Sequence, residues 1–372
     1  MAAPVRYHIG KFPPNLDWAR LVSLIGKASE AVGRYDGVVS AIPNAEVLLS
    51  PLFTQEAVLS SRIEGTVATI GEVLEVEGGD ASAMNPRRRE DAYEIINYRK
   101  AVRFCEAELR DRPISQHMLR QAHSILMAGV RGRNKDPGSY RKQQNWIGAP
   151  KCKIEEASFI PIDQSHLQAG LDAWDAFMTS DPVNPLVQLA VLHAEFEALH
   201  PFLDGNGRLG RMIIPLYMHA QGALRSGPHF YVSAFLDAHR DEYLDRLRAV
   251  SADDDWTGWV LFFLEALRFQ AQENEAKATE ILSLYAEVKE RVVKFTHSQH
   301  AIQAVDFIFS RPVFFGPTFI TDSRIPRASA TRILTLMRTH NLLRTLRAGL
   351  GRRPGLYEFS ALLEITERDT QT

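Results

Sequence analysis

The chain has 372 residues, 45% of them hydrophobic, which is enough for two or three domains of about 150 residues with buried cores. Its formal net charge of −2 excludes a strong overall attraction to nucleic acid or anionic membranes, so any such attraction must be local. Two cysteines exclude a disulfide framework, and without an apolar signal core or a run of about 18 apolar residues we expect a cytoplasmic protein and no membrane span.

The first part of the chain has mostly helical patterning. One helix is predicted over residues 15–37, where it meets a glycine, as helix ends often do. A second covers residues 54–63 and stops near Glu64 and Gly65. Residues 76–90 have the composition of a loop. Helical patterning then resumes over residues 90–110 and 115–130.

Residues 136–162 lack the helical patterning of the segments on either side. Extended runs near 141–147 and 158–162 flank a region of Gly and Pro, which predicts a β-hairpin that projects from a helical body. The next helix has a clear start, because Asn184 suits the N-cap and Pro185 the first turn. Helical patterning continues to about residue 295.

The C-terminal part begins with a helix that ends at a proline. Residues 316–343 resemble a helix-turn-helix, and residues 345–360 show the pattern of a strand, a Gly/Arg turn and a strand, which together indicate a winged helix. From Ser323 to Tyr357 there are eight arginines and no acidic residue, the charge pattern expected for DNA binding. A dimerisation or target-docking module is the alternative.

The stretch 200-HPFLDGNGRLGR-211 concentrates residues that can take part in chemistry, and two interpretations of it find little support in the surrounding sequence. Residues 205–210 spell G-x-G-x-x-G, but the dinucleotide fingerprint needs a preceding strand, and the preceding segment is helical. His193, Glu197 and His200 share one helix face at i, i+4 and i+7, a spacing that can hold a metal. A histidine so placed is more often a hydrogen-bonded core residue.

The third interpretation, a phosphate cradle, uses every polar residue of the stretch. A kink at residues 205–207 presents successive backbone N–H groups to an anion, and the helix that follows adds its positive end. Arg208 and Arg211 can engage further phosphate oxygens. Asp204 can hold a Mg²⁺ that bridges two phosphates. The usual pKa of a histidine suits His200 to take a proton from an incoming hydroxyl.

This stretch resembles the Fic motif, H-x-F-x-[DE]-G-N-G-R-x-x-R, and matches every fixed position. The resemblance implies a helical core that transfers AMP from ATP to a Ser, Thr or Tyr hydroxyl of a target protein. It makes His200 the general base, Asp204 the Mg²⁺ ligand and Phe202 an apolar anchor of the loop. It also implies that Arg211 grips the γ-phosphate. The nucleotide-binding positions that it implies are Gly205, Asn206, Gly207, Arg208, Leu209, Gly210, Arg211 and Tyr243.

Two further features resemble the same family. The stretch 60-SSRIEG-65 matches the inhibitory pattern [ST]-x-x-x-E-[GN], with Ser60 and Glu64 in fixed places. As in the family's second class, it ends a helix N-terminal to the core, so Glu64 is implied to pair with Arg211 and exclude the γ-phosphate. A solvated glutamate at a helix end is the alternative. The predicted hairpin resembles the family's flap, which adds a target segment as a strand. Tyr243 resembles a tyrosine near the adenine, but core packing explains it equally well.

These observations predict a mainly α fold, with a helical Fic core, a small β-hairpin flap and a C-terminal winged helix-turn-helix domain. We expect an inhibitory region over 1–100, the Fic core over 101–275, and a linker helix with the winged helix over 276–372. The predicted function is an autoinhibited protein adenylyltransferase that uses ATP and Mg²⁺ and also modifies itself.

Two alternative functions stay open at this point. One is a transcriptional regulator with a nucleotide-sensing Fic core. The other is a Fic-fold transferase of another phosphate-containing group, or a hydrolase that removes AMP with the help of Glu64. The sequence also leaves open whether residues 316–357 bind DNA and whether the chain forms a homodimer.

Overall fold

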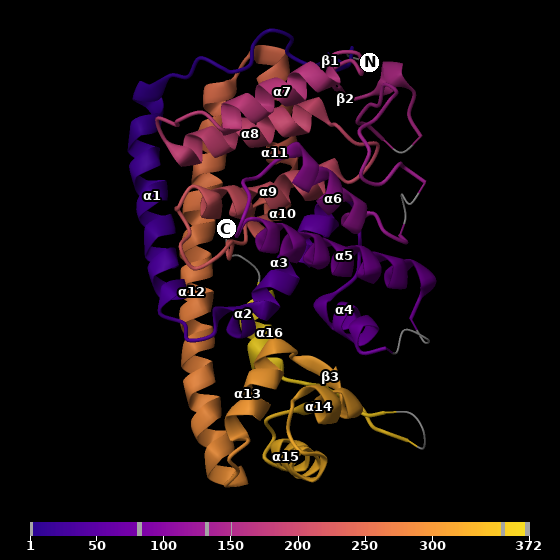
Figure 1. The fold of residues 1–372 in the computed structure, drawn as a ribbon, viewed down its shortest axis with the longest axis vertical. Coiled ribbons are helices and arrows are strands. Elements are labelled where there is room, and N and C mark those ends of the chain that lie inside the picture. The colour runs from indigo at the N-terminus through magenta and orange to yellow at the C-terminus, as the bar shows by residue number, and fades with distance from the viewer. Residues whose placement is uncertain (1–2, 80–83, 131–133, 150, 351–353, 369–372) are drawn as a thin grey trace.

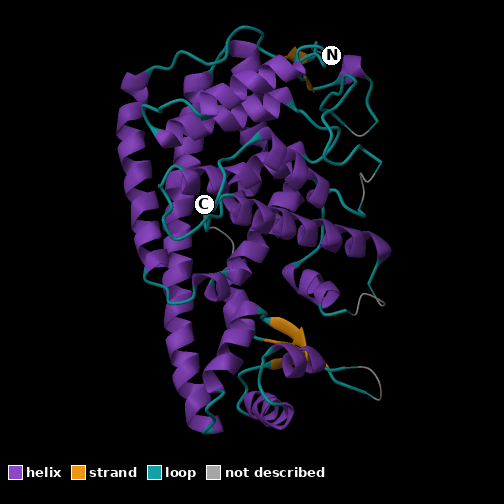
Figure 2. Ribbon diagram, in the orientation of Figure 1, coloured by secondary structure: helices purple, strands orange, loops and turns teal. Residues whose placement is uncertain are grey.

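The computed structural model describes residues 3–79, 84–130, 134–149, 151–350 and 354–368. These residues form a mainly helical protein with a few short strands, which confirms the predicted fold class (Figure 2). None of the helices described is long and apolar enough to cross a membrane. Those before the C-terminal part are α1 (Trp18–Ser40), α2 (Ala45–Leu48), α3 (Ser50–Ile63), α4 (Ile70–Glu77), α5 (Pro86–Glu108), α6 (Gln116–Leu126), the 3-10 helix η1 (Ile154–Glu156), α7 (Leu167–Met178), α8 (Pro185–Leu199), α9 (Asn206–Ala220), α10 (Ser233–Ala238), α11 (Arg240–Asp253) and α12 (Trp256–Thr296).

The long helix α12 runs through most of the molecule, with α1 alongside it (Figure 1). α1 begins at an N-cap, Asp17, whose carboxylate accepts a hydrogen bond from the Arg20 N–H. The predicted end at Gly37 was wrong, because the helix continues to Ser40. Val39, 2% exposed, packs into the core. Burial of this side chain stabilises the folded state by about 1.5–3 kcal/mol. That gain offsets the loss of about 1 kcal/mol that a glycine inside a helix causes.

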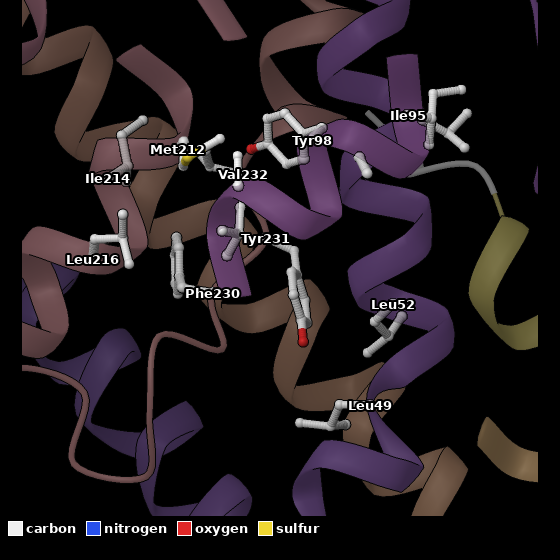
Figure 3. Close-up of a cluster of buried hydrophobic side chains, with 14 of the residues drawn as sticks. Leu49, Leu52, Ile95, Tyr98, Met212, Ile214, Leu216, Phe230, Tyr231 and Val232 are labelled. Atoms are coloured by element: carbon white, nitrogen blue, oxygen red, sulfur yellow. The ribbon is translucent and has the colours of Figure 1, made fainter. Parts of the chain in front are cut away.

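Helices α8 and α9 form the centre of the fold. As predicted, Asn184 is the N-cap of α8, with its Oδ1 accepting from the N–H groups of Leu186 and Val187, and Pro185 occupies the first turn. α8 is buried on nearly all sides. Figure 3 shows apolar side chains from the start of α3, from α5, from α9 and from residues 230–232 gathered in one cluster of the core. The two ends of the Fic motif are therefore carried by helices that are largely buried.

The loop predicted over residues 76–90 was wrong at both ends. α4 continues to Glu77 and α5 already begins at Pro86. Asn85 accepts a hydrogen bond from the Arg87 N–H at 2.9 Å, so Asn-Pro starts this helix as it starts α8. Residues 80–83 of the predicted loop lie outside the described residues.

The predicted hairpin is present only as an antiparallel bridge between Ile147 and Phe159. The described residues between them form η1 and turns rather than two paired strands. β2 (Phe159–Ile160) also pairs in parallel with β1 (Val5–Arg6). β1 lies on the other edge of β2, because Phe159 bonds Ile147 through its own N–H and carbonyl while the Tyr7 N–H bonds the Ile160 carbonyl. Residue 150, inside the predicted turn, lies outside the described residues.

The C-terminal part lies at the lower end of the molecule in Figure 1. Its antiparallel sheet has the order β3-β5-β4. That the unit is a winged helix stays a prediction, as does the three-part division of the chain, and α12 crosses the boundary placed at residue 275 without a break. The elements are α13 (Ala301–Ser310), β3 (Val313–Phe315), α14 (Gly316–Asp322), α15 (Arg327–Thr339), β4 (Arg344–Arg347), β5 (Leu356–Glu358) and α16 (Ser360–Glu367).

Helix α3 connects this C-terminal part to the centre of the fold. α13 and α16 both contact α3, and the Ser50 hydroxyl at its start donates to the Ser310 carbonyl at 3.2 Å. The other end of α3 carries Ser60 and leads to Glu64. One helix of 14 residues therefore touches the C-terminal part at one end and the Fic motif at the other.

Candidate active site

A cavity of about 290 Å³ lies where the C-terminal ends of α3 and α8 meet α11 and the first turn of α9. It brings together five of the predicted site residues: Glu64, His200, Gly207, Arg211 and Tyr243. The other predicted site residues do not line it: Ser60, Asp204, Gly205, Asn206, Arg208, Leu209 and Gly210. The full lining is Ile63, Glu64, Ile147, Ser158, Phe159, Ala194, Glu197, Ala198, His200, Gly207, Arg211, Arg240, Tyr243, Leu244, Leu247 and Arg248.

His200 is the residue at which α8 ends. It has left-handed backbone angles, φ 45° and ψ 60°, and the next residue, Pro201, cannot continue the helix. Its ring Nδ1 lies 3.3 Å from the Glu197 carbonyl. A carbonyl only accepts, so Nδ1 carries the hydrogen and Nε2 is left to accept a proton. Burial lowers the pKa of His200 to about 4, so the ring is a neutral base at physiological pH.

The turn between the two helices is held by its own side chains. Asn206 clamps it, since its Oδ1 accepts from the Phe202 N–H at 2.8 Å and its Nδ2 donates to the Phe202 carbonyl at 2.9 Å. The Phe202 ring is fully buried and stacks on His123 at 3.8 Å, which confirms its predicted role as an apolar anchor. His123 Nε2 in turn lies 3.0 Å from the Asp204 carbonyl. The shape of the turn is thus set before any ligand binds.

The first turn of α9 presents the predicted anion nest. Gly205, at φ 78°, turns the chain into the helix, a conformation that favours glycine. No carbonyl among the described residues accepts from the N–H groups of Asn206, Gly207 and Arg208, as expected for the first turn of a helix. Gly207 faces the cavity, and a Cβ there would collide with the Glu64 carboxylate. These three N–H groups can cradle a phosphate. Leu209 is fully buried in the core.

Arg211 is held from one side by helix α3. Its Nη2 donates to Glu64 Oε1 at 2.7 Å and to the Ser60 carbonyl at 2.8 Å, and its Nε donates to the Ser60 hydroxyl at 3.0 Å. The Arg211 side chain is 1% exposed and that of Glu64 is 41% exposed. The structure thus brings Ser60, Glu64 and Arg211 together as the resemblance implied.

The ion pair has a clear electrostatic signature. Burial alone would raise the pKa of the Glu64 carboxyl, but the charge and hydrogen bond of Arg211 hold it below its usual value. Burial would lower the pKa of Arg211, and the facing carboxylate of Glu64 raises it instead. Both groups are therefore charged at neutral pH, and the cavity contains an internal carboxylate where an anion would meet the nest.

Arg208 does not reach the cavity, in contrast to the prediction that it engages phosphate oxygens. Its side chain is 4% exposed and forms an ion pair with Glu94 of α5 at 2.9 Å. It also lies 3.6 Å from Asp204 Oδ1. The two arginines lie on different faces of α9, so the Arg208 side chain points toward α5 and the Arg211 side chain points toward α3. Arg208 fastens the motif to the body of the protein.

Asp204 lies at the edge of the nest and suits the chemistry of Mg²⁺. Its side chain is 44% exposed, its Oδ1 accepts from the Gly205 N–H at 2.6 Å, and no described residue bonds its other oxygen. Mg²⁺ is commonly bound through one or two carboxylates together with water and substrate phosphates. Among the described residues, no group of three His, Cys, Asp or Glu is placed to hold a metal by itself. Asp204 therefore fits a metal that arrives with a phosphate.

Tyr243 and His193 form a buried pair behind Arg211. The Tyr243 hydroxyl lies 2.9 Å from His193 Nε2, and His193 Nδ1 lies 3.2 Å from the Gly210 carbonyl. Burial lowers the pKa of His193 to about 3 and raises that of Tyr243. Both ring nitrogens of His193 are thus engaged within the core, so the metal interpretation of His193 with Glu197 and His200 lacks an available first ligand.

The sequence did not point to Arg141 or Asn145, which attach the segment after α6 to the motif. The buried Arg141 donates from Nε to the His200 carbonyl at 3.0 Å and also binds the Leu199 and Ile162 carbonyls. Asn145 Nδ2 donates to the Phe202 carbonyl at 3.0 Å. A cation such as Arg141 interacts favourably with the carbonyl groups at the C-terminal end of α8. Arg141 lies in a predicted strand, and nothing in the nearby sequence indicates that it binds this helix end. These bonds tie to the motif the segment that carries Ile147, which lines the cavity together with Phe159.

Comparison with known proteins agrees with this geometry. The model of the Fic/DOC family N-terminal region matches residues 22–105, and that of the Fic/DOC family matches residues 113–218. The "Protein adenylyltransferase Fic" of Drosophila grimshawi is 26% identical over 211 residues, which cover 54% of this chain and 39% of that protein. The "Protein adenylyltransferase fic-1" of Caenorhabditis elegans is 25% identical over 170 residues, or 43% and 30% of the two chains. The chain thus spans about two fifths or less of these curated relatives.

Solved structures extend the similarity of fold beyond the motif. A Fic family protein from Desulfovibrio desulfuricans aligns over 93% of this chain and 98% of its own, with a TM-score of 0.58 and 21% identity. A Fic domain containing signaling protein from Bacteroides thetaiotaomicron aligns over 68% and 96%, with a TM-score of 0.55 and 17% identity. At these identities the likeness speaks for the fold alone. With two family models over about half of the chain and an unbroken motif at the cavity, the chain belongs to the Fic/DOC family.

Proposed function

We propose that this chain is an autoinhibited protein adenylyltransferase, which transfers AMP from ATP to a Ser, Thr or Tyr hydroxyl of a target protein, itself included. One observation carries the proposal: a neutral His200, a phosphate nest at Gly207 and an Arg211 engaged by Glu64 all border one cavity. A dinucleotide oxidoreductase or a kinase of the P-loop type would need other elements around the phosphates. The names of the relatives support the same activity.

The chemistry follows from the positions of the groups. His200 Nε2 accepts the proton of the acceptor hydroxyl as that oxygen forms a bond to the α-phosphorus. The bond from the α-phosphorus to the oxygen that bridges to the β-phosphate breaks, and pyrophosphate leaves. The N–H groups of Asn206, Gly207 and Arg208 stabilise charge on the phosphate oxygens. Asp204 would hold Mg²⁺, which supplies further neutralisation of that charge. His200 then returns its proton to solvent.

The same geometry supports autoinhibition. A γ-phosphate that approaches Arg211 has to displace the Glu64 carboxylate from it. While Glu64 stays, the triphosphate binds in a different position and its α-phosphorus is out of line with the incoming hydroxyl. A misplacement of about 1 Å can reduce a rate about 10²-fold. A carboxylate on Arg211 therefore suffices to hold the enzyme at a low basal rate.

Target binding is assigned to the bridged segment at the cavity mouth. Ile147 and Phe159 line the cavity and are held near His200 through Arg141. An extended target peptide that adds along this segment would bring its hydroxyl toward His200 Nε2. Backbone N–H and carbonyl groups of the segment near Ile147 can form this pairing. A complete hairpin would offer the same kind of edge.

The experiment that tests the proposal is incubation of the full chain with isotopically labelled ATP and Mg²⁺. Glu64→Gly should incorporate label from the α-phosphate into protein and none from the γ-phosphate. The same variant with His200→Ala should incorporate none from either position. Label from the γ-phosphate would make the protein a kinase, and no incorporation by Glu64→Gly with any added protein would contradict transferase activity.

A second function, DNA binding by residues 316–357, is favoured by the surface of α15. Its outward residues include Arg327, Ala328, Thr331 and Thr335, with Arg324 just before the helix. Basic and small polar side chains of this kind suit a helix in the major groove. Arg324→Ala with Arg327→Ala should lower the affinity for duplex DNA and flatten its salt dependence by about two charges. Equal affinity of variant and parent would exclude this face as the DNA site.

A further inference from the structure

Glu197 is a cavity residue that the proposed mechanism does not use. It lies on α8 one turn before His200 and lines the same cavity. Its Oε1 is buried and has no hydrogen-bond partner among the described residues. Buried polar atoms nearly always have a partner, yet no described residue bonds either oxygen of this carboxyl. Because Oε1 is packed against Gly210, a ligand that enters the cavity would meet the other oxygen of Glu197.

The protein leaves room for this carboxyl. Gly210, on the facing turn of α9, lies directly against Oε1, and a Cβ at that position would collide with it. Gly210, which stands at a variable position of the motif, thus admits the Glu197 side chain. The titratable or charged groups that face it come from three other elements: Arg211 of α9, Glu64 after α3, and Tyr243, Arg240 and Arg248 of α11.

Burial and the charges in the cavity favour the protonated form of Glu197 more than is usual for a glutamate. Burial raises the pKa of Glu197 to about 7, the charge of Arg211 opposes this, and the Glu64 carboxylate adds to it. Two carboxyls thus face one guanidinium, and Glu64 takes the short ion pair. The second carboxyl is easier to keep neutral than to keep ionised in a site where one negative charge already balances Arg211.

We propose that Glu197 is a proton-bearing ligand of the nucleotide: when a phosphate replaces Glu64 on Arg211, the Glu197 O–H donates a hydrogen bond to that phosphate. This inference rests on the proposed function, because it takes ATP as the ligand. A phosphate group carries more negative charge than the Glu64 carboxylate that it replaces. The proton on Glu197 is therefore held more tightly with ATP bound than without it, and ATP binding takes up a proton from solvent at this residue.

The test is calorimetric titration of ATP with Mg²⁺ into the full chain that carries Glu64→Gly and His200→Ala. The first change exposes Arg211, and the second prevents turnover and removes the neighbouring titratable ring. Heats in two buffers of different ionisation enthalpy give the number of protons taken up. The matched control adds Glu197→Gln, whose amide still donates a hydrogen bond but cannot titrate, so protons from ATP itself cancel in the comparison.

The parent should take up a measurable fraction of a proton more than the Glu197→Gln protein near pH 7. Glu64→Gly also removes a charge that raises the pKa of Glu197, so free Glu197 in this protein titrates below the value of about 7 that it has beside Glu64. From that lower pH upward, the affinity of the parent should fall by up to about tenfold per pH unit more steeply than that of the control, because deprotonation of free Glu197 competes with binding. Glu197→Leu, which can neither donate nor titrate, should show the control's proton count and bind ATP about tenfold more weakly than Glu197→Gln. It serves as the second comparison if the glutamine variant does not fold.

Three results would overturn the inference. Equal proton uptake and equal pH dependence in parent and control would show that Glu197 takes up no proton when ATP binds. ATP binding and the proposed function would then still hold. Loss of ATP affinity in a folded Glu197→Gln protein would mean that an ionised carboxylate is required. Failure of the parent to bind ATP at all would overturn this inference together with the proposed function.

Discussion

Glu64 Oε1 lies 2.7 Å from Arg211 Nη2, although 147 positions separate the two residues in the chain. The contact is backed by Ser60, which binds the same guanidinium through both its hydroxyl and its carbonyl. The Glu64 carboxylate also lies directly over Gly207, at the N-terminal end of α9. A carboxylate of the chain itself thus occupies the position where the nest and Arg211 would together meet a phosphate.

Removal of this carboxylate should activate the protein. We expect Glu64→Gly to raise self-modification by one to two orders of magnitude, about 1.4–2.8 kcal/mol of barrier, because the γ-phosphate no longer competes for Arg211. The double change Glu64→Gly with Arg211→Ala should stay slow, since no clamp is left to release. The measurement is the initial rate of label transfer from ATP.

A matched control is available at the same helix end. Arg62 pairs with Asp237 on the surface and does not line the cavity, so Arg62→Ala should leave the rate near that of the unaltered chain. If Arg62→Ala activates as much as Glu64→Gly, general loosening of α3 explains the effect and the carboxylate does not. A Glu64→Gly protein no faster than the parent would remove autoinhibition and leave the transferase proposal to rest on His200.

His200→Ala should abolish AMP transfer while ATP affinity changes by no more than a few-fold. The ring is placed to take the proton of the acceptor, whereas phosphate is held by the nest and Arg211. Calorimetric binding compared with label transfer separates the two quantities. If binding and transfer fall together, the histidine supports the structure of the turn instead of acting as the base.

The lowered pKa of His200 makes a prediction about pH. A ring with a pKa of about 4 stays unprotonated, and able to accept a proton, at every pH well above that value. At saturating ATP, transfer by the Glu64→Gly protein should therefore stay constant from pH 8 down to about 5 and fall below that. An apparent pKa near 6.5 in the kcat profile would show that the ring is not buried when the acceptor is present.

Asp204→Ala should remove the Mg²⁺-dependent part of the activity. The backbone nest stays intact, so ATP should still bind, though more weakly. The matched change is Asp204→Asn, which keeps the acceptor oxygen for the Gly205 N–H but loses the charge that a metal requires. In the label assay, Mg²⁺ should no longer stimulate Asp204→Ala, and it should stimulate Asp204→Asn only at a raised concentration. Unchanged Mg²⁺ dependence in both would place the metal ligand elsewhere.

Arg208→Ala should act on stability more than on chemistry. It leaves Glu94 in a buried site without its arginine, and loss of one partner of a buried pair typically costs about 3–5 kcal/mol. The midpoint of thermal unfolding should fall clearly, and the paired change with Glu94→Gln should recover part of the loss. If the midpoint holds while ATP affinity collapses, Arg208 binds the nucleotide, as the family motif implied.

Local sequence determined the elements around the site. Asn184 and Pro185 start α8 where the capping pattern placed them, and Pro201 with Gly205 ends one helix and begins the next. These features depend on residues within a few positions of one another, so short-range sterics and capping bonds decide them. Asn85 and Pro86 start α5 by the same rule, so the loop-like composition of residues 76–90 continues into the first turn of a helix.

What the sequence could not determine is which groups meet across the fold. The strand that pairs with β2 is β1, from the far N-terminus, and no pattern within residues 136–162 indicates it. The rotation of α9 sends Arg208 to Glu94 and Arg211 to Glu64, although both arginines belong to one motif. Long-range contacts of this kind are selected by the packing of whole helices.

By itself, then, the sequence determined the mainly helical class, the kinked loop between α8 and α9, and the presence of a histidine, an aspartate and two arginines within it. Only the tertiary structure decided the state of each group. Burial makes His200 a neutral base, engages Arg211 with Glu64, withdraws Arg208 to Glu94 and leaves Glu197 beside a guanidinium already balanced. Protonation and pairing depend on the dielectric and on charges brought close by distant segments, and a pattern of residues carries neither.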